Sequence, residues 1–354
     1  MPQPTTHYLV IRRAIPREQW SDWWDQFKPY FGLGSTAPDL FYFPRISIGR
    51  TYDSEISDAI HADCSFDLFC TMLDIAKRNK INPSNPFVAE KQFAFSVGFY
   101  SHVVTDCIFH PYVYRSTHDH WNTKNFINES KHKIEEFRID RGIHRMIYGK
   151  DQEIGTTSWK CPGGTPDFLE YAIVDLFNSA LLLVYPTNFN TTKSINDDSH
   201  PIHQAYRALN SEIPYLFNGQ KLFLWGSGQG LSTSDINFDD YFFTTPYPAT
   251  LGLEEYTPQD LFNFACSACK KVFLDSLGFF YDEQYDSASD YFHRHPANYL
   301  AQGNWNLDTG LLCQYNNDAL MQKECPEHYQ YKADELKRQY FELNQLYNPE
   351  DFSA

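Results

Sequence analysis

The sequence has little basic charge, no long apolar run and only a few scattered cysteines. Its 29 Lys and Arg residues stand against 45 Asp and Glu residues, which gives a net charge of -16 over 354 residues. This balance argues against an extended groove that follows nucleic-acid phosphates and against electrostatic adhesion to an anionic membrane. It leaves open a neutral or zwitterionic lipid surface, which exposed aromatic side chains could contact.

Two further absences concern membranes and secretion. No stretch approaches the roughly 18 apolar residues of a transmembrane helix, so no membrane span is expected. The first residues, MPQPTTHYLVIRRAI, contain too short an apolar run for a signal peptide. The sequence therefore predicts a protein that works in the cytoplasm or is exported by a signal-independent route, or else the trimmed mature form of a secreted protein.

The eight cysteines lack the density of a disulfide-stapled domain. Cys266 and Cys269 form a CxxC motif, but it lies within LFNFACSACKKVF, which is typical of a buried helix, so packing is expected rather than zinc or redox chemistry. The run GSGQG has no GK[ST] ending and no strand-then-helix frame, so it does not predict a phosphate loop.

The chain does contain enough apolar material for a large core, because 42% of its residues are hydrophobic and 17% are aromatic. Helical spacing of the apolar residues predicts an all-α fold, a multi-helix bundle over residues 1–280. Helices are expected near residues 16–30, 51–80, 93–112, 129–148, 166–185 and 258–280. An irregular aromatic-rich insert is expected at about residues 213–257, and residues 281–354 are interpreted as a C-terminal extension of unknown role.

The stretch FAFSVGFYSHVVTDCIFHPY, residues 93–112, carries three ligand-type side chains at intervals of four. His102, Asp106 and His110 therefore share one face of an apolar helix, with the two histidines about 12 Å apart along its axis. That is too far for all three to bind one ion, so a carboxylate between two imidazoles suits two neighbouring metals. Pro111 disfavours helical geometry at His110 and predicts that this ligand sits at the helix end.

A second helix, over residues 129–148, places His132 and Glu136 four apart on one face. A histidine and a carboxylate at that spacing form a zinc half-site. On a surface helix the same pair is more often a weak side-chain contact. His118, His120 and His144 lie nearby, and spacing alone does not exclude them as ligands.

Three more residues are candidate metal ligands, but each of them alone is weak evidence for a site. His61 lies on or beside the apolar stripe of an expected helix, where a satisfied core histidine is the common case. Asp39 ends a loop marked by Gly and Pro, a usual place for a turn or cap residue. His7 stands alone near the start of the chain.

In order along the chain, these motifs resemble the zinc-dependent phospholipase C family, whose fold is shared with zinc-dependent single-strand nucleases. The matching pieces fall within roughly residues 7–140 and are His7, GSTAPD ending at Asp39, His61, SHVVTDCIFHP and HKIEE. Each motif is loose, but the ordered set is specific. The resemblance implies a helical bundle around a zinc cluster.

The resemblance also implies two to three Zn²⁺ ions and their ligands. The implied ligands are Asp39, His61, His102 and Asp106 for one ion, His110, His132 and Glu136 for a second, and Asp106 with His7 for a third. In the family's secreted members the third ion also uses the free amine and carbonyl of an N-terminal tryptophan. This sequence begins with Met1 and has no tryptophan before Trp20. That is its main departure from the family.

The implied activity is phospholipase C hydrolysis of a glycerophospholipid to diacylglycerol and a phosphorylated head group by metal-activated water, with Asp39 as general base or as the group that orients the water. The expected partner is phospholipid at a membrane or micelle surface, with no stable nucleic-acid partner. Two alternatives stay open. One is a single-strand nuclease of the same fold, which could stack bases on aromatic side chains. The other is a non-catalytic metal-binding relative. The sequence specifies neither the head group nor the oligomeric state.

Overall fold

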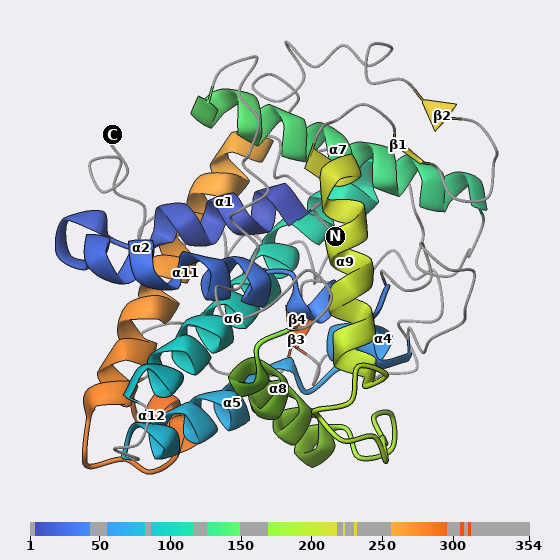
Figure 1. The fold of residues 1–354 in the computed structure, drawn as a ribbon. Coiled ribbons are helices and arrows are strands. Elements are labelled where there is room, and N and C mark those ends of the chain that lie inside the picture. Colours follow the sequence, from blue (N-terminus) through green and yellow to red (C-terminus); the bar gives the residue numbers. More distant parts are fainter. Residues whose placement is uncertain are drawn as a thin grey trace.

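The computed structural model describes residues 4–42, 55–81, 86–116, 126–148, 169–217, 222–223, 230–231, 256–295, 305–307 and 311–312. Over these ranges the fold is helical, as the sequence predicts, apart from two short antiparallel strand pairs (Figure 1). Most of the aromatic insert and most of the C-terminal extension lie outside the described residues. The division into a bundle and an extension stays a prediction.

The helices are α1 (Pro4–Ala14), α2 (Arg17–Gly34), the 3₁₀ helix η1 (Ala37–Tyr42), α4 (Glu55–Ala62), α5 (Ser65–Lys80), α6 (Pro86–Ser116), α7 (Phe126–Tyr148), α8 (Tyr171–Val184), α9 (Pro201–Phe217), α11 (Pro258–Tyr281) and α12 (Ala288–Arg294). The strands are β1 (Leu222–Phe223), β2 (Gly230–Leu231), β3 (Trp305–Asn306) and β4 (Leu311–Leu312). None of the described helices combines the length and the hydropathy needed to cross a membrane.

Helix α6 is the central element, and α2, α5 and α11 pack around it (Figure 1). Residues 92–110 of α6 are all buried, and this includes the polar side chains among them. A helix that is apolar on every side belongs inside a core rather than at its surface. The polar side chains of α6 therefore face other parts of the protein and need partners there.

Helices α2 and α6 cross with their backbones in contact. A Cβ atom on Gly98 would lie 2.3 Å from the carbonyl oxygen of Phe31, and one on Gly34 would lie 2.2 Å from that of Phe95. Only glycine leaves room for this approach. Because Ser35 follows Gly34 directly, the crossing also fixes where the chain leaves α2 beside α6.

The helix expected over residues 51–80 is two helices, α4 and α5, and the prediction of one is wrong. Between them Cys64 adopts the left-handed conformation, with φ 60° and ψ 15°, and its N–H donates to Oδ1 of Asp63 (2.7 Å). Among the described residues it is the one non-glycine residue with a positive φ. This turn aims α4 and α5 in different directions although the sequence offers no Gly or Pro there.

The prediction that α6 ends at His110 is also wrong, because the helix continues through Pro111 to Ser116. Tyr112 and Val113 are fully buried in the core. Burial of these two large side chains outweighs the local preference that proline imposes on the residue before it.

Two helices, α1 and α9, are not among those expected from the sequence. Helix α1 begins at Pro4, which suits the first turn of a helix because it has no N–H to leave unpaired. Helix α9 reaches Phe217 and so occupies the start of the expected insert. The packing role expected for Cys266 and Cys269 is confirmed, since both are buried in α11 and neither forms a disulfide.

The burial of His200, which lies just before α9, predicts that the folded protein loses stability in acid. It is fully buried, its Nε2 lies 3.2 Å from Oδ1 of Asn178, and its Nδ1 accepts the N–H of Ile202. Burial, followed by the charge of His203, lowers the pKa of His200 from 6.5 to about 4. The unfolded chain therefore binds a proton that the folded chain excludes, so this residue's stabilising effect is lost as the pH falls from 6.5 toward 4. Urea midpoints at about pH 7 and about pH 4.5 should differ more in the wild type than in His200→Gln, and equal differences would contradict the prediction.

Candidate metal centre

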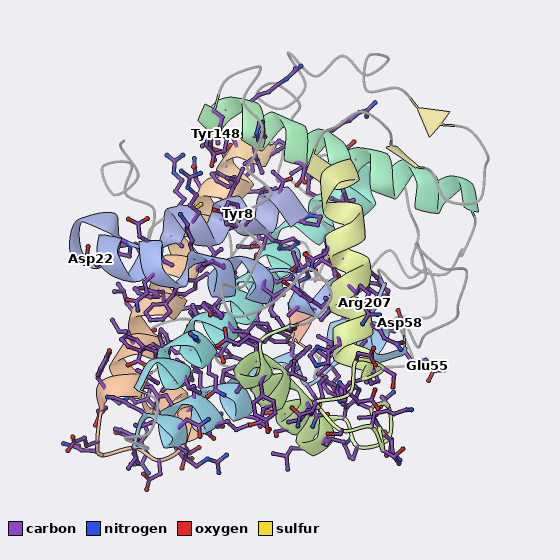
Figure 2. The ribbon with its side chains drawn as sticks, viewed as in Figure 1. Tyr8, Asp22, Glu55, Asp58, Tyr148 and Arg207 are labelled. Carbon is purple, nitrogen blue, oxygen red and sulfur yellow. The ribbon has the colours of Figure 1, made fainter. Side chains whose placement is uncertain are left out.

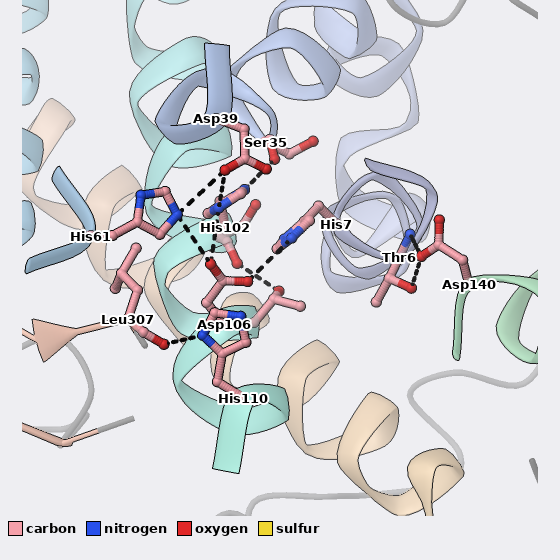
Figure 3. A network of polar contacts seen from close by, with 12 residues as sticks. Thr6, His7, Ser35, Asp39, His61, His102, Asp106, His110, Asp140 and Leu307 are labelled. Atoms are coloured by element: carbon pink, nitrogen blue, oxygen red, sulfur yellow. Dashed lines mark hydrogen bonds and ion pairs between the residues drawn. The ribbon is translucent and has the colours of Figure 1, made fainter. Parts of the chain in front are cut away.

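Side chains from four elements converge at the middle of the molecule (Figure 3). Helix α1 supplies one, η1 one, α4 one and α6 two, in the order His7, Asp39, His61, His102 and Asp106. All five are buried, and Asp39, at 5%, has the largest exposed fraction. The packing of α1, α2 and η1 against α6, and of α4 against η1, brings these distant parts of the sequence together.

The carboxylate of Asp106 lies between three imidazoles. Its Oδ2 is 3.1 Å from Nε2 of His102 and 3.6 Å from Nε2 of His61, and its Oδ1 is 3.3 Å from Nε2 of His7. The ring of His7 also stacks on that of His102, with centroids 3.8 Å apart. Each imidazole thus directs Nε2 at a carboxylate oxygen.

Asp39 extends the cluster on the other side. Its Oδ1 is 3.3 Å from Nε2 of His61 and 3.8 Å from Nε2 of His102. Two groups result, His7–His102–Asp106 and Asp39–His61–His102, and within each group the ligand atoms lie within 4.8 Å of one another. Ligands about 2.0–2.2 Å from a tetrahedral zinc lie roughly 3.4 Å from each other, so both groups have the spacing of a zinc site.

Many of these polar atoms are buried without a hydrogen bond. They are both nitrogens of His7, Oδ1 of Asp39, Nε2 of His102 and both carboxylate oxygens of Asp106. Burying a polar or charged group without a partner costs several kcal/mol, about 2–7 for a neutral one. Cations bound within the two ligand groups would satisfy these atoms, apart from Nδ1 of His7, which lies on the other side of the ring from Asp106. The donor set, imidazole nitrogen and carboxylate oxygen, is one that zinc binds.

Main-chain carbonyls orient three of the histidines. The pairs are His61 Nδ1 with Ser57 O (2.6 Å), His102 Nδ1 with Ser35 O (2.8 Å), and His110 Nδ1 with Leu307 O. A carbonyl can only accept, so each ring carries a proton on Nδ1, and Nε2 is the nitrogen that can bind a metal. This is the usual outer support of a histidine that ligates a metal.

The cluster perturbs the pKa values of its members. Burial acts to raise the pKa of Asp106, but the charges of His102, His110 and His7 outweigh it and hold that pKa well below its usual range. Burial, and then the charge of His102, lowers the pKa of His7 to about 4, so this imidazole is neutral at pH 7. At His61 the effect of burial is outweighed by the adjacent carboxylates of Asp106 and Asp39, and the pKa rises to about 10. A metal bound at His61 would therefore release a proton.

A family model described as zinc dependent phospholipase C matches residues 6–182, half of the chain. The chain belongs to this family. No curated protein and no solved structure matches it. The matched range of the zinc phospholipase C family contains most of α1 and all of η1, α4, α6 and α7, and with them every ligand position that the sequence predicts. It ends before α9, α11 and the β3–β4 pair.

The structure describes the other predicted ligands of the zinc phospholipase C family less completely. His110 is buried on α6, one turn beyond Asp106, and belongs to neither of the two groups above (Figure 3). Glu136 is buried on α7. The side chain of His132 lies outside the described residues. The site formed by His110, His132 and Glu136 therefore stays a prediction.

Asp140 of α7 supports the site but is not among the predicted residues. Its carboxylate accepts the N–H groups of Thr5 (3.2 Å) and Thr6 (2.9 Å) and the Thr6 hydroxyl, in the first turn of α1 (Figure 3). These are N–H groups that a helix start leaves unpaired. Asp140 thus fixes α1 immediately before His7. The sequence does hold a signal for it, because Asp140 continues the four-residue spacing of His132 and Glu136.

The other end of α1 is held to the same helix. The guanidinium carbon of Arg12 lies 5.1 Å from the ring centroid of Tyr148, the last residue of α7 (Figure 2). A cation over an aromatic face at this distance is attracted to it. Helix α7 therefore contacts both ends of the helix that carries His7.

Replacing Asp140 by alanine should weaken the His7 position selectively. Loss of a cap costs roughly 1 kcal/mol, and here it also frees the turn that precedes His7. We expect fewer zinc ions per chain, with the Asp39–His61–His102 group still occupied, as measured by elemental analysis after dialysis. The variant Arg12→Ala, which alters the far end of α1, serves as control. Equal zinc content in wild type and Asp140→Ala would contradict the prediction.

Proposed function

We propose that this chain is a zinc-dependent phosphodiester hydrolase, a phospholipase C that cleaves glycerophospholipids to diacylglycerol and a phosphorylated head group. The observation that carries the proposal is the buried Asp106 carboxylate, which lies within 3.6 Å of three Nε2 atoms and has no hydrogen-bond partner. Membership of the zinc phospholipase C family supports the choice of metal and reaction.

Two to three zinc ions are part of the proposal. The residues assigned to them are Asp39, His61, His102 and Asp106 for the first, His110, His132 and Glu136 for the second, and His7 with Asp106 for the third. The first set and the His7–Asp106 pair have the close contacts described above. The low pKa of His7 supports its role, because only a neutral imidazole can donate a lone pair to a metal.

Bound zinc supplies Lewis acidity, which offsets the negative charge of a phosphodiester and lowers the pKa of a coordinated water. The chain's own residues supply orientation and proton transfer. Asp39 is the candidate general base, because it borders both His61 and His102 and has the largest exposed fraction in the cluster. A carboxylate at the solvent side of the site can orient the attacking water and accept its proton.

Head-group release from mixed phospholipid micelles tests the proposal. The zinc-loaded wild type should release phosphorylated head group, and Asp39→Asn should lose most of this activity, by roughly 10²–10⁴-fold for a general base. His293→Ala is the matched control, since His293 is exposed on α12 and far from the cluster in sequence. A zinc-loaded wild type that releases no head group would overturn the proposal, and single-stranded DNA and RNA would then be the next substrates to test.

A further inference from the structure

A short segment from beyond the family region reaches the metal centre. Strand β3 and Leu307 pack against α4 and α6, and Leu307 is fully buried. The N–H of Leu307 donates to the carbonyl oxygen of His61 (2.8 Å), and its own carbonyl accepts Nδ1–H of His110 (Figure 3). One residue's main chain therefore joins two predicted ligands that come from different helices.

The contact at His61 stabilises the end of a short helix. Helix α4 has eight residues and ends at Ala62, so the carbonyl of His61 belongs to the last turn, where carbonyls accept from donors outside the helix. Leu307 supplies such a donor. Because the imidazole of His61 also bonds to Ser57 in the preceding turn, fixing this helix end fixes the ring that faces Asp39 and Asp106.

The contact at His110 selects a tautomer. The carbonyl of Leu307 can only accept a hydrogen bond, so it retains the proton on Nδ1 and leaves Nε2 of His110 as the atom able to bind a metal. His110 and Leu307 are 197 residues apart in the sequence, so no local feature of α6 provides this support.

We propose that residues 305–307 form a strap that positions His61 and His110 for metal binding through the main chain of Leu307. The proposal rests on the zinc site of the proposed function but not on its substrate. Pairing with β4 fixes the register of the strap, with Trp305 opposite Leu312 and Asn306 opposite Leu311. Leu307 is a positioning residue, since its contacts are to ligands and not to substrate.

The strap predicts a reciprocal coupling between zinc and residues 305–307. If an ordered strap raises the affinity for zinc, bound zinc must stabilise the strap by the same free energy. Loss of outer-shell support at a metal ligand typically costs 10–100-fold in affinity. Zinc loading should therefore slow amide hydrogen exchange at Leu307 by roughly 10–100-fold in the full chain, beyond any change in distant helices such as α12.

Two variants separate the main chain of Leu307 from its side chain. Leu307→Pro removes the N–H that His61 accepts, whereas Leu307→Met keeps both main-chain contacts and nearly the same volume. Competition with a chromogenic chelator should show zinc affinity lowered roughly 10–100-fold in Leu307→Pro and changed little in Leu307→Met. A folded Leu307→Pro variant that binds zinc as tightly as the wild type would overturn the proposal.

Hydrogen exchange of the wild type decides the matter if Leu307→Pro does not fold. Equal exchange at Leu307 in the zinc-free and zinc-loaded full chain would overturn the strap. Zinc affinity and hydrogen exchange are both measured without head-group release, so neither measurement depends on the substrate. A protein that binds zinc and hydrolyses phospholipid without this coupling would retain the proposed function and lose the strap. A protein that shows the coupling between zinc and the strap but hydrolyses no phospholipid would support the strap and overturn the proposed function.

Discussion

Replacing His102 by alanine is expected to abolish zinc binding at both ligand groups and, with it, head-group release. His102 is the residue that the two groups share, with Nε2 3.1 Å from Asp106 and 3.8 Å from Asp39. Its loss leaves each group with two ligands and leaves the Asp106 carboxylate with less of the charge that keeps it ionised. Zinc per chain after dialysis, measured by elemental analysis beside activity, tests this expectation.

The control for His102→Ala must remove an imidazole without disturbing the cluster. His293→Ala does so, because His293 is exposed on α12 and bonds its Nδ1 to Ser289 within the same helix. Circular dichroism of both variants should show the helical spectrum of the wild type. Full zinc content and full activity in folded His102→Ala would rule out the metal assignment made here.

Replacing Gly98 by alanine is expected to separate α2 from α6. The added methyl group would lie 2.3 Å from the carbonyl oxygen of Phe31 and 3.1 Å from Cα of Gly34. Both are backbone atoms, so the helices must move apart. We expect unfolding to become easier by about 3 kcal/mol or more, at the upper end of overpacking effects. Zinc affinity should fall too, since the shift draws the Ser35 carbonyl away from His102.

Gly278→Ala is the matched control for Gly98→Ala. Gly278 also lies inside a helix, α11, but an added Cβ would meet the hydroxyl of Tyr291 at 2.4 Å, so a movement of this side chain rather than of the backbone would make room for it. The gain of about 1 kcal/mol in helix propensity opposes the cost of that movement. Urea unfolding should therefore show a large loss for Gly98→Ala and a small change for Gly278→Ala. Similar changes in both would contradict a backbone contact at the crossing.

Most of the candidate metal centre could be predicted from the sequence, because the candidate ligands on α6 follow helical spacing. Intervals of four place His102, Asp106 and His110 on one side of a helix whatever surrounds it. The same spacing also contains Gly98, one turn before His102, and the structure shows that this glycine brings the end of α2 against the ligand face. The all-helical class followed from the same periodicity.

Other parts of the site depend on contacts that cannot be predicted from the types of the residues that make them. The turn between α4 and α5 uses a left-handed cysteine, Cys64, where glycine is usual, so the spacing of apolar residues runs on through it. Leu307 acts through its N–H and C=O, which every residue but proline possesses. Its place beside His61 and His110 is a property of the packed chain and not of a motif.

The link between His110 and Leu307 also determines when, during synthesis, the metal centre can be finished. A ribosome adds roughly 5–20 residues per second, so the 197 residues that separate the two take roughly 10–40 s to make. Until then both His61 and His110 lack the contacts that Leu307 makes with them. Zinc that reached the nascent chain in that interval would meet a candidate centre without the support of Leu307.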